Sequence, residues 1–94
     1  MATYRVIAWK CIPASVEAQD GADSATVELS ERFQMLIDSV AMQRGLHGSD
    51  EYLDSWTRGE ARDRPGTARE VADAVATDLE GRFAEFASRA FTIA

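Results

Sequence analysis

The hydrophobic pattern of the first 29 residues predicts an antiparallel sheet. Residues 4–12 concentrate β-branched and aromatic side chains, as expected of a central strand with contacts on both faces. Pro13 has no backbone N–H, so we expect the chain to kink or leave the sheet there before residues 15–18 resume an extended path. The Asp20-Gly21 pair predicts a hairpin, because glycine permits the positive φ of tight turns, and residues 25–29 then form the returning strand.

Three later stretches have helical spacing. The first begins at the candidate N-cap Ser30 and ends near Gly45, the second spans residues 48–59, and the third spans residues 67–90 and opens with a Thr-x-x-Glu capping box. Residues 59–66 predict a charged surface loop, because they combine Pro, Gly and ionic side chains. The first helix has one apolar stripe, which we expect to cover the sheet. This stripe consists of Phe33, Leu36, Ile37, Val40 and Ala41.

Strands therefore come first and helices follow, in the order β-β-β-α-α-α. This order predicts an α+β fold, with a small antiparallel sheet of about three strands and three helices packed on one face. A chain of 94 residues has the length of one domain, so we expect residues 1–94 to fold as a unit. Its composition, 46% hydrophobic and 28% charged, is typical of folded proteins.

The charge balance disfavours two classes of partner. Ten Lys and Arg face sixteen Asp and Glu, which gives a formal net charge of −6. Nucleic acids and anionic membranes both require a clustered cationic face, so neither is expected to bind. No window approaches the ~18 apolar residues of a membrane span, and the single Cys11 cannot form an internal disulfide. These features predict a soluble cytoplasmic protein.

Recognisable catalytic constellations are missing from the sequence. A reactive thiol at Cys11 needs a neighbouring base, and nothing in the spacing brings His47, the single histidine, close to it. The sequence lacks the ligand spacing of zinc sites, a Gly-rich phosphate loop and a serine nucleophile elbow. We therefore predict no catalytic residue, no metal site and no cofactor, and keep an enzyme that uses Cys11 only as a third hypothesis.

The run from Trp9 to Val16 is the best candidate for a binding site, because it joins an amphipathic aromatic, a cation and a fixed bend. The Trp9 side chain is either buried as an anchor of the core or exposed beside Cys11, since alternate residues of a strand face opposite ways. Arg32, at the start of the first helix, could add a cation beside Trp9. The residues predicted to bind a partner or ligand are Trp9, Lys10, Ile12, Pro13, Arg32, Tyr52 and Trp56.

Several segments between Trp9 and Trp56 match a known pattern: Trp9-Lys10, Ile12-Pro13-Ala14, Val16, Leu29 to Phe33, Ile37-Asp38, Ala41-Met42, Gly48-Ser49-Asp50, Tyr52-Leu53 and Trp56. Taken together, these segments resemble a known bacterial family, the conserved virulence factor C-like domain. The family label implies no mechanism. In some relatives the domain is joined to an iron–sulfur scaffold-like domain, and free-standing versions occur near genes of one-carbon and corrinoid metabolism. The resemblance therefore implies an accessory module that meets larger enzymes.

Two main hypotheses follow. The first is a non-catalytic interaction module that docks a partner protein through residues 9–16, with Arg32, Tyr52 and Trp56 nearby, because interfaces favour Trp, Tyr and Arg as anchors. The second is a binding domain for a small anionic ligand or cofactor, with Trp9, Lys10 and Arg32 around a shallow pocket. Pairing of an exposed sheet edge with a second copy, which would form a homodimer, is also open.

Overall fold

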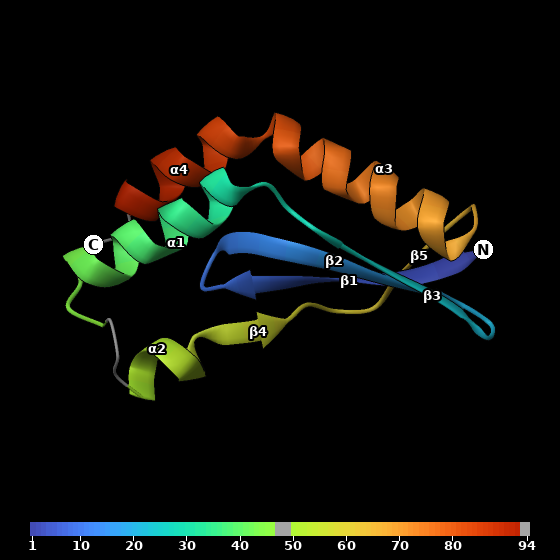
Figure 1. The fold of residues 1–94 in the computed structure, drawn as a ribbon, viewed down its shortest axis with the longest axis horizontal. Helices are drawn as coiled ribbons and strands as arrows, with labels where there is room; N and C mark the ends of the chain where they lie inside the picture. Colours follow the sequence, from blue (N-terminus) through green and yellow to red (C-terminus); the bar gives the residue numbers. More distant parts are fainter. Residues whose placement is uncertain (47–49, 93–94) are drawn as a thin grey trace.

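A sheet with helices on one face organises the structure, which is a computed structural model that describes residues 1–46 and 50–92. The elements are β1 (Ala2–Trp9), β2 (Ile12–Asp20), β3 (Asp23–Glu28), α1 (Glu31–Gln43), α2 (Asp50–Asp54), β4 (Trp56–Arg58), β5 (Arg62–Arg64), α3 (Ala68–Gly81) and α4 (Phe83–Thr92). Figure 1 shows α1, α3 and α4 on one side of the sheet and the short α2 on the other. The predicted α+β class is confirmed.

The sheet is antiparallel throughout the described residues, with strand order β3-β2-β1-β4, and β5 also pairs with β1. The first predicted strand is central, as expected. Residues directly opposite in a ladder share a face. Val6 and Val16 form one such pair beneath the helices, whereas Arg5 and Glu17 form a pair on the other side, which we call the open face.

Two additional strands correct the predicted count of three. Trp56 was expected within the second helix, on one face with Tyr52 and Leu53, but it begins β4 and pairs with Trp9. The predicted loop contains β5, which pairs with the start of β1. β4 and β5 form because the second edge of β1 carries backbone N–H and C=O groups that need hydrogen-bond partners. Gly59 joins the two short strands, and its N–H donates to the Val6 carbonyl at 2.9 Å.

The β1–β2 connection is tighter than predicted. β1 ends at Trp9, and Lys10 turns the chain with a φ of +55°, the one positive φ among the described non-glycine residues. Pro13 does not leave the sheet, because it lies in β2 opposite Ala8. It does coincide with an irregularity, since the register of the ladder shifts between Ile7 and Ala8.

The third predicted helix is divided in two. α3 ends at Gly81 and α4 begins at Phe83, with Arg82 between them at φ −104° and ψ 14°. The break lets α3 cover the sheet while α4 packs on α1. The ring of Phe33 accordingly lies 5.0 Å from that of Phe83 and 6.2 Å from that of Phe86.

One cluster of buried side chains lies between the sheet and these helices and extends to the strand end at Trp9. Its largest fully buried side chains are Trp9, Phe33, Ile12, Ile37, Val16 and Val71. The predicted stripe of α1 is confirmed in full, because all five of its side chains are buried. His47, the only histidine of the sequence, lies outside the described residues. Gly48 and Ser49, where the second helix was expected to start, also lie outside them.

Candidate functional site

Trp9 is a core anchor and not an exposed surface. Its side chain has no solvent exposure, and its Nε1 donates to the backbone carbonyl of Tyr52 at 2.9 Å. The two rings lie 5.5 Å apart. The alternative that Trp9 faces solvent is therefore wrong, because β4 and α2 cover the strand end that the sequence left open. Trp9 fixes the segment that carries Tyr52 and Trp56.

Most of the other selected residues gather around Trp9. Ile12 pairs with it across the β1–β2 ladder, and both Ile12 and the neighbouring Pro13 are buried. Lys10 is exposed, with its Nζ 5.5 Å from the centre of the Trp9 ring. Tyr52 and Trp56 are half-buried, with an edge-to-face ring contact at 6.4 Å. These residues therefore lie close together, and their role in binding stays a prediction.

Arg32 lies apart from this group and does not face Trp9. Its guanidinium stacks 4.6 Å from the centre of the Phe83 ring, and its Nη2 pairs with Oε1 of Glu80 at 3.1 Å. Ser30 donates to the same carboxylate through its N–H and its hydroxyl. Desolvation raises the pKa of Glu80, but the hydrogen bonds from Ser30 and Arg32 outweigh it and lower the pKa below 4.5. The arginine fastens α1 to the end of α3.

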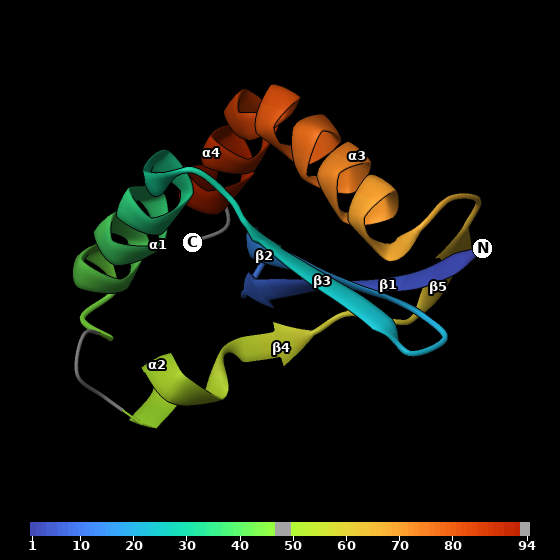
Figure 2. The ribbon, with the colours of Figure 1, turned by 45° about the vertical axis from the view of Figure 1, so that its right-hand side comes forward.

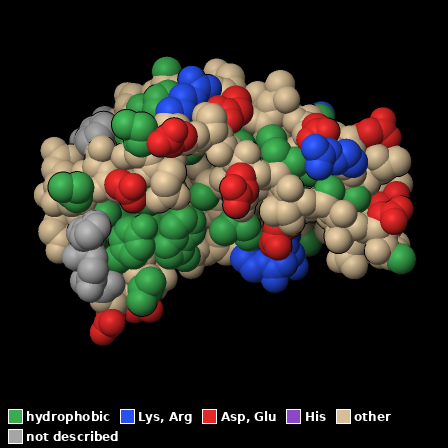
Figure 3. Space-filling model, in the orientation of Figure 1, with side chains coloured by type: hydrophobic (Ala, Val, Ile, Leu, Met, Phe, Trp, Pro, Cys, Tyr) green, Lys and Arg blue, Asp and Glu red, His purple; other side chains and the backbone are tan. Residues whose placement is uncertain are grey.

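A half-open cavity of about 470 Å³ lies on the open face where β3 leads into α1, and we call it the Trp56 hollow. Figure 3 shows hydrophobic side chains gathered in this region, between α1 and β4. Polar groups from β2, β3 and the first turn of α1 complete the rim. The apolar lining comes from Ile7, Ala14, Leu29 and Trp56, and the polar lining from Ser15, Glu28, Ser30, Glu31 and Gln34.

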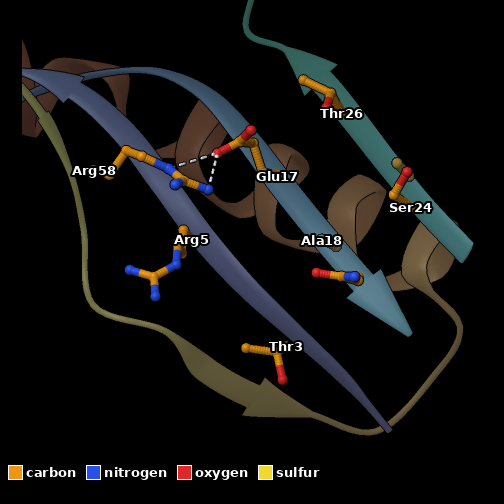
Figure 4. Close-up of a pocket in the computed structure, with 9 residues that line it drawn as sticks. Thr3, Arg5, Glu17, Ala18, Ser24, Thr26 and Arg58 are labelled. Carbon is orange, nitrogen blue, oxygen red and sulfur yellow. Dashed lines mark hydrogen bonds and ion pairs between the residues drawn. The ribbon is translucent and has the colours of Figure 1, made fainter. Parts of the chain in front are cut away.

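A second hollow, of about 200 Å³, lies further along the open face and has a polar lining. Figure 4 shows its side chains, among them Arg58, whose Nη2 lies 3.1 Å from Oε1 of Glu17. Arg5 donates to the Gly59 carbonyl at 2.9 Å. Both arginines are thus engaged within the protein, so this hollow offers little free positive charge to a ligand.

A third cavity, which we call the turn pocket, has a volume of about 180 Å³ and lies beside the β1–β2 turn. Lys10 and Arg44 both contribute to it, and neither forms an ion pair with a described residue. Arg44 therefore supplies the cation beside Trp9 and Lys10 that the sequence analysis expected from Arg32. The lining is mostly apolar and consists of Trp9, Lys10, Cys11, Ile12, Val40, Arg44 and Ala90.

Potential metal ligands do not cluster among the described residues, and the Cys11 thiol lies in the turn pocket. Within residues 1–46 and 50–92, no group of three or more His, Cys, Asp and Glu is placed to hold a metal ion. Cys11 is half-buried in the turn pocket. Because His47 is not described, the Cys11–His47 pair stays untested. No described helix has the length and hydrophobicity needed to cross a bilayer.

Sequence reasoning missed several of the residues that line the Trp56 hollow and the turn pocket. Ile7 and Leu29 were assigned to strands, but nothing local shows that they meet Trp56 on one face. Gln34 and Arg44 lie at opposite ends of α1 and resemble ordinary solvated positions. A signal existed only for Ile7, because its alternation with Val6 places it on the face opposite the core.

Comparison with known proteins agrees with the resemblance seen in the sequence. A family model with the description "Virulence factor" matches residues 7–88, which is most of the chain and includes the Trp56 hollow. No curated protein and no solved structure shows a significant match. The chain belongs to the virulence factor family.

Proposed function

We propose that this protein is a non-catalytic interaction module that docks a partner protein through the Trp56 hollow. The observation that carries the proposal is a half-buried tryptophan beside Ile7 and Leu29 in an open cavity. The rest of this face is polar, with Ser, Thr, Gln and paired ionic side chains. Tryptophan is enriched among the residues that contribute most to interface energies, and such residues cluster in desolvated pockets. The hollow is therefore suited to an anchoring side chain.

Charge supports a specific kind of anchor. Glu28 and Glu31 line the hollow, and neither forms an ion pair with a described residue. A volume of about 470 Å³ lies within the ~300–1,000 Å³ typical of binding sites. The partner that fits best presents one large apolar side chain flanked by Lys or Arg. Opposite charges at the rim would steer its approach.

The family context gives this module a setting. We place it in a bacterial cytoplasmic complex as an accessory protein. The resemblance to domains joined to iron–sulfur scaffold-like proteins, and to versions near genes of one-carbon metabolism, supports a metabolic partner. The lack of a membrane-spanning helix among the described residues is compatible with this location.

Photo-crosslinking tests the docking proposal. A photoreactive phenylalanine at Gln34, on the rim, is expected to capture one partner in cells that produce the protein. The same residue at Met35, which is adjacent in sequence, 61% exposed and outside the hollow, is the matched control. Labelling from both positions alike, or from neither, would refute docking in the hollow.

Affinity provides a second readout once that partner is purified. Trp56→Thr, which keeps a strand-forming residue in β4, is expected to weaken binding about 30-fold, the equivalent of the ~2 kcal/mol of a strong anchor. Leu53→Ser removes an apolar side chain that is 65% exposed outside the hollow and should leave the affinity unchanged. Thermal unfolding of each variant verifies that the fold persists.

The turn pocket favours a second candidate function, the binding of a small carboxylate. Lys10 and Arg44 supply two cations at an otherwise apolar cavity, and Trp9 forms part of its wall. In a Trp56→Phe background, where Trp9 is the remaining tryptophan, butyrate is expected to change the fluorescence and butanol is not. Arg44→Gln should abolish the change. An equal response to both compounds would exclude recognition of the carboxylate.

A further inference from the structure

The outer edge of β3 is open. β3 is the last strand of the sheet on this side, and Figure 2 shows no described element along its outer side. β3 has six residues, Asp23–Glu28, so its free edge is as long as an average strand. The opposite edge is made of two three-residue strands, β4 and β5, with Gly59 between them. The long edge is therefore the one able to accept a further strand.

The ladder identifies the backbone groups that are free. In an antiparallel pair, alternate residues direct both N–H and C=O toward the neighbouring strand. Leu29 donates to the Ala14 carbonyl at 2.9 Å, so the residues at two-residue intervals before it, Val27 and Ala25, also point inward. The residues between them point outward. These are Ser24, Thr26 and Glu28, all exposed.

Negative charge surrounds this edge. Asp20 and Asp23 lie at one end of β3, and Glu28 and Glu31 lie at the other. None of the four forms an ion pair with a described residue. Lysine and arginine side chains on an added strand would therefore gain partners at both ends.

The same charges oppose pairing with a second copy. If two β3 edges met antiparallel about a two-fold axis, with Thr26 opposite Thr26, the end of one strand that carries Asp20 and Asp23 would approach the end of the other that carries Glu28 and Glu31. Like charges brought together in this way repel each other. The homodimer that the sequence left open is thus disfavoured at this edge.

We infer that β3 binds an extended, Lys- or Arg-bearing segment of a partner protein by strand addition, with Ser24, Thr26 and Glu28 supplying the backbone hydrogen bonds. This inference rests on the proposed function, because it gives the partner a second contact on the same molecule. Backbone pairing provides affinity in this mode of recognition, and the carboxylates select the charge of the segment. The Trp56 hollow lies beside the end of β3, since Glu28 belongs to both surfaces.

Amide exchange measured by NMR tests the inference directly. The probe is a blocked nine-residue peptide of alternating Lys and Val. In the free protein the outward amides of Thr26 and Glu28 should exchange quickly, and the inward amide of Val27 slowly. Saturating peptide is expected to slow Thr26 and Glu28 at least tenfold and to leave Val27 unchanged. A twin peptide of the same charge, N-methylated at two adjacent central residues to block both of its edges, should have no effect.

Variants separate this contact from the rest of the surface. Thr26→Pro removes an outward N–H that the ladder does not use, and should abolish protection, whereas Thr26→Val should preserve it. Equal protection by both peptides would show binding by charge alone and overturn the inference, as would no protection at millimolar peptide. Protection that rises with protein concentration without peptide would assign the edge to a second copy. A crosslinked partner that binds Thr26→Pro as tightly as wild type would refute the edge contact and leave the docking proposal standing.

Discussion

Replacement of Trp9 by alanine is expected to lower the free energy of unfolding by about 3–5 kcal/mol, the typical cost of removing a buried aromatic side chain. Trp9 has no solvent exposure, contacts the ring of Tyr52 and donates to its backbone carbonyl. Its loss leaves a cavity and frees the segment that contains α2 and β4. Since small domains have only about 5–15 kcal/mol of stability, most of the margin would disappear. Urea unfolding followed by circular dichroism measures the change.

Trp9→Phe is the matched control for this prediction. Phenylalanine keeps most of the apolar volume and loses the indole N–H, so a smaller destabilisation of about 1–3 kcal/mol is expected. A Trp9→Ala variant within about 1 kcal/mol of wild type would contradict the buried position. The prediction also has a practical consequence. A binding defect in Trp9→Ala would report loss of the fold, so Trp56→Thr is the proper probe of the hollow.

Local periodicity was sufficient where an element buries one continuous face. The α1 stripe was predicted residue by residue, because the spacing of apolar positions in a helix is set by its 3.6-residue turn. The hairpin at Asp20 and Gly21 followed from the same kind of local rule, since Gly21 has a φ of +62°. Such features depend on neighbours in the chain, so the sequence alone displays them.

The two strands that the sequence analysis missed, β4 and β5, form only through pairing with a strand that is distant in the sequence. β4 and β5 have three residues each, too few for a periodic signal. They form because β1 offers a second edge 47 or more residues earlier in the chain, the shortest separation being that between Trp9 and Trp56. The close approach of Gly59 to the Val6 carbonyl, where a Cβ would lie only 3.1 Å away, belongs to the same contact. Nothing in residues 56–64 specifies that neighbour.

The residues of the candidate site show the same difference between what neighbours in the chain determine and what long-range contacts determine. Trp9, Ile12 and Pro13 lie close together because they are close in sequence, but their exposure depends on what covers the strand end. Arg32 was assigned to the wrong neighbour, because Glu80, which holds it, is 48 residues further on. Arg44 carries the cation of the turn pocket instead. Composition identifies candidate anchors, and only the fold decides which of them face solvent.

Phe33→Ala should produce a loss of similar size at the other end of the core, about 3–5 kcal/mol. Phe33 is 1% exposed, and its ring contacts Phe83 and Phe86 of α4. α4 has ten residues, and an isolated helix of that length is marginal in water. Removal of the Phe33 ring should therefore loosen α4 before α3, which also packs on the sheet.

Amide exchange and urea unfolding together test whether α4 loosens before α3. In Phe33→Ala, the amides of α4 should exchange faster than those of α3, and the unfolding midpoint should fall. Met35→Ala, on the same helix but 61% exposed, should shift the free energy of unfolding by no more than about 0.5 kcal/mol. If α3 and α4 lost protection together, the two helices would form one cooperative unit despite the break at Arg82. The ring contacts between α1 and α4 would then support the whole core and not α4 alone.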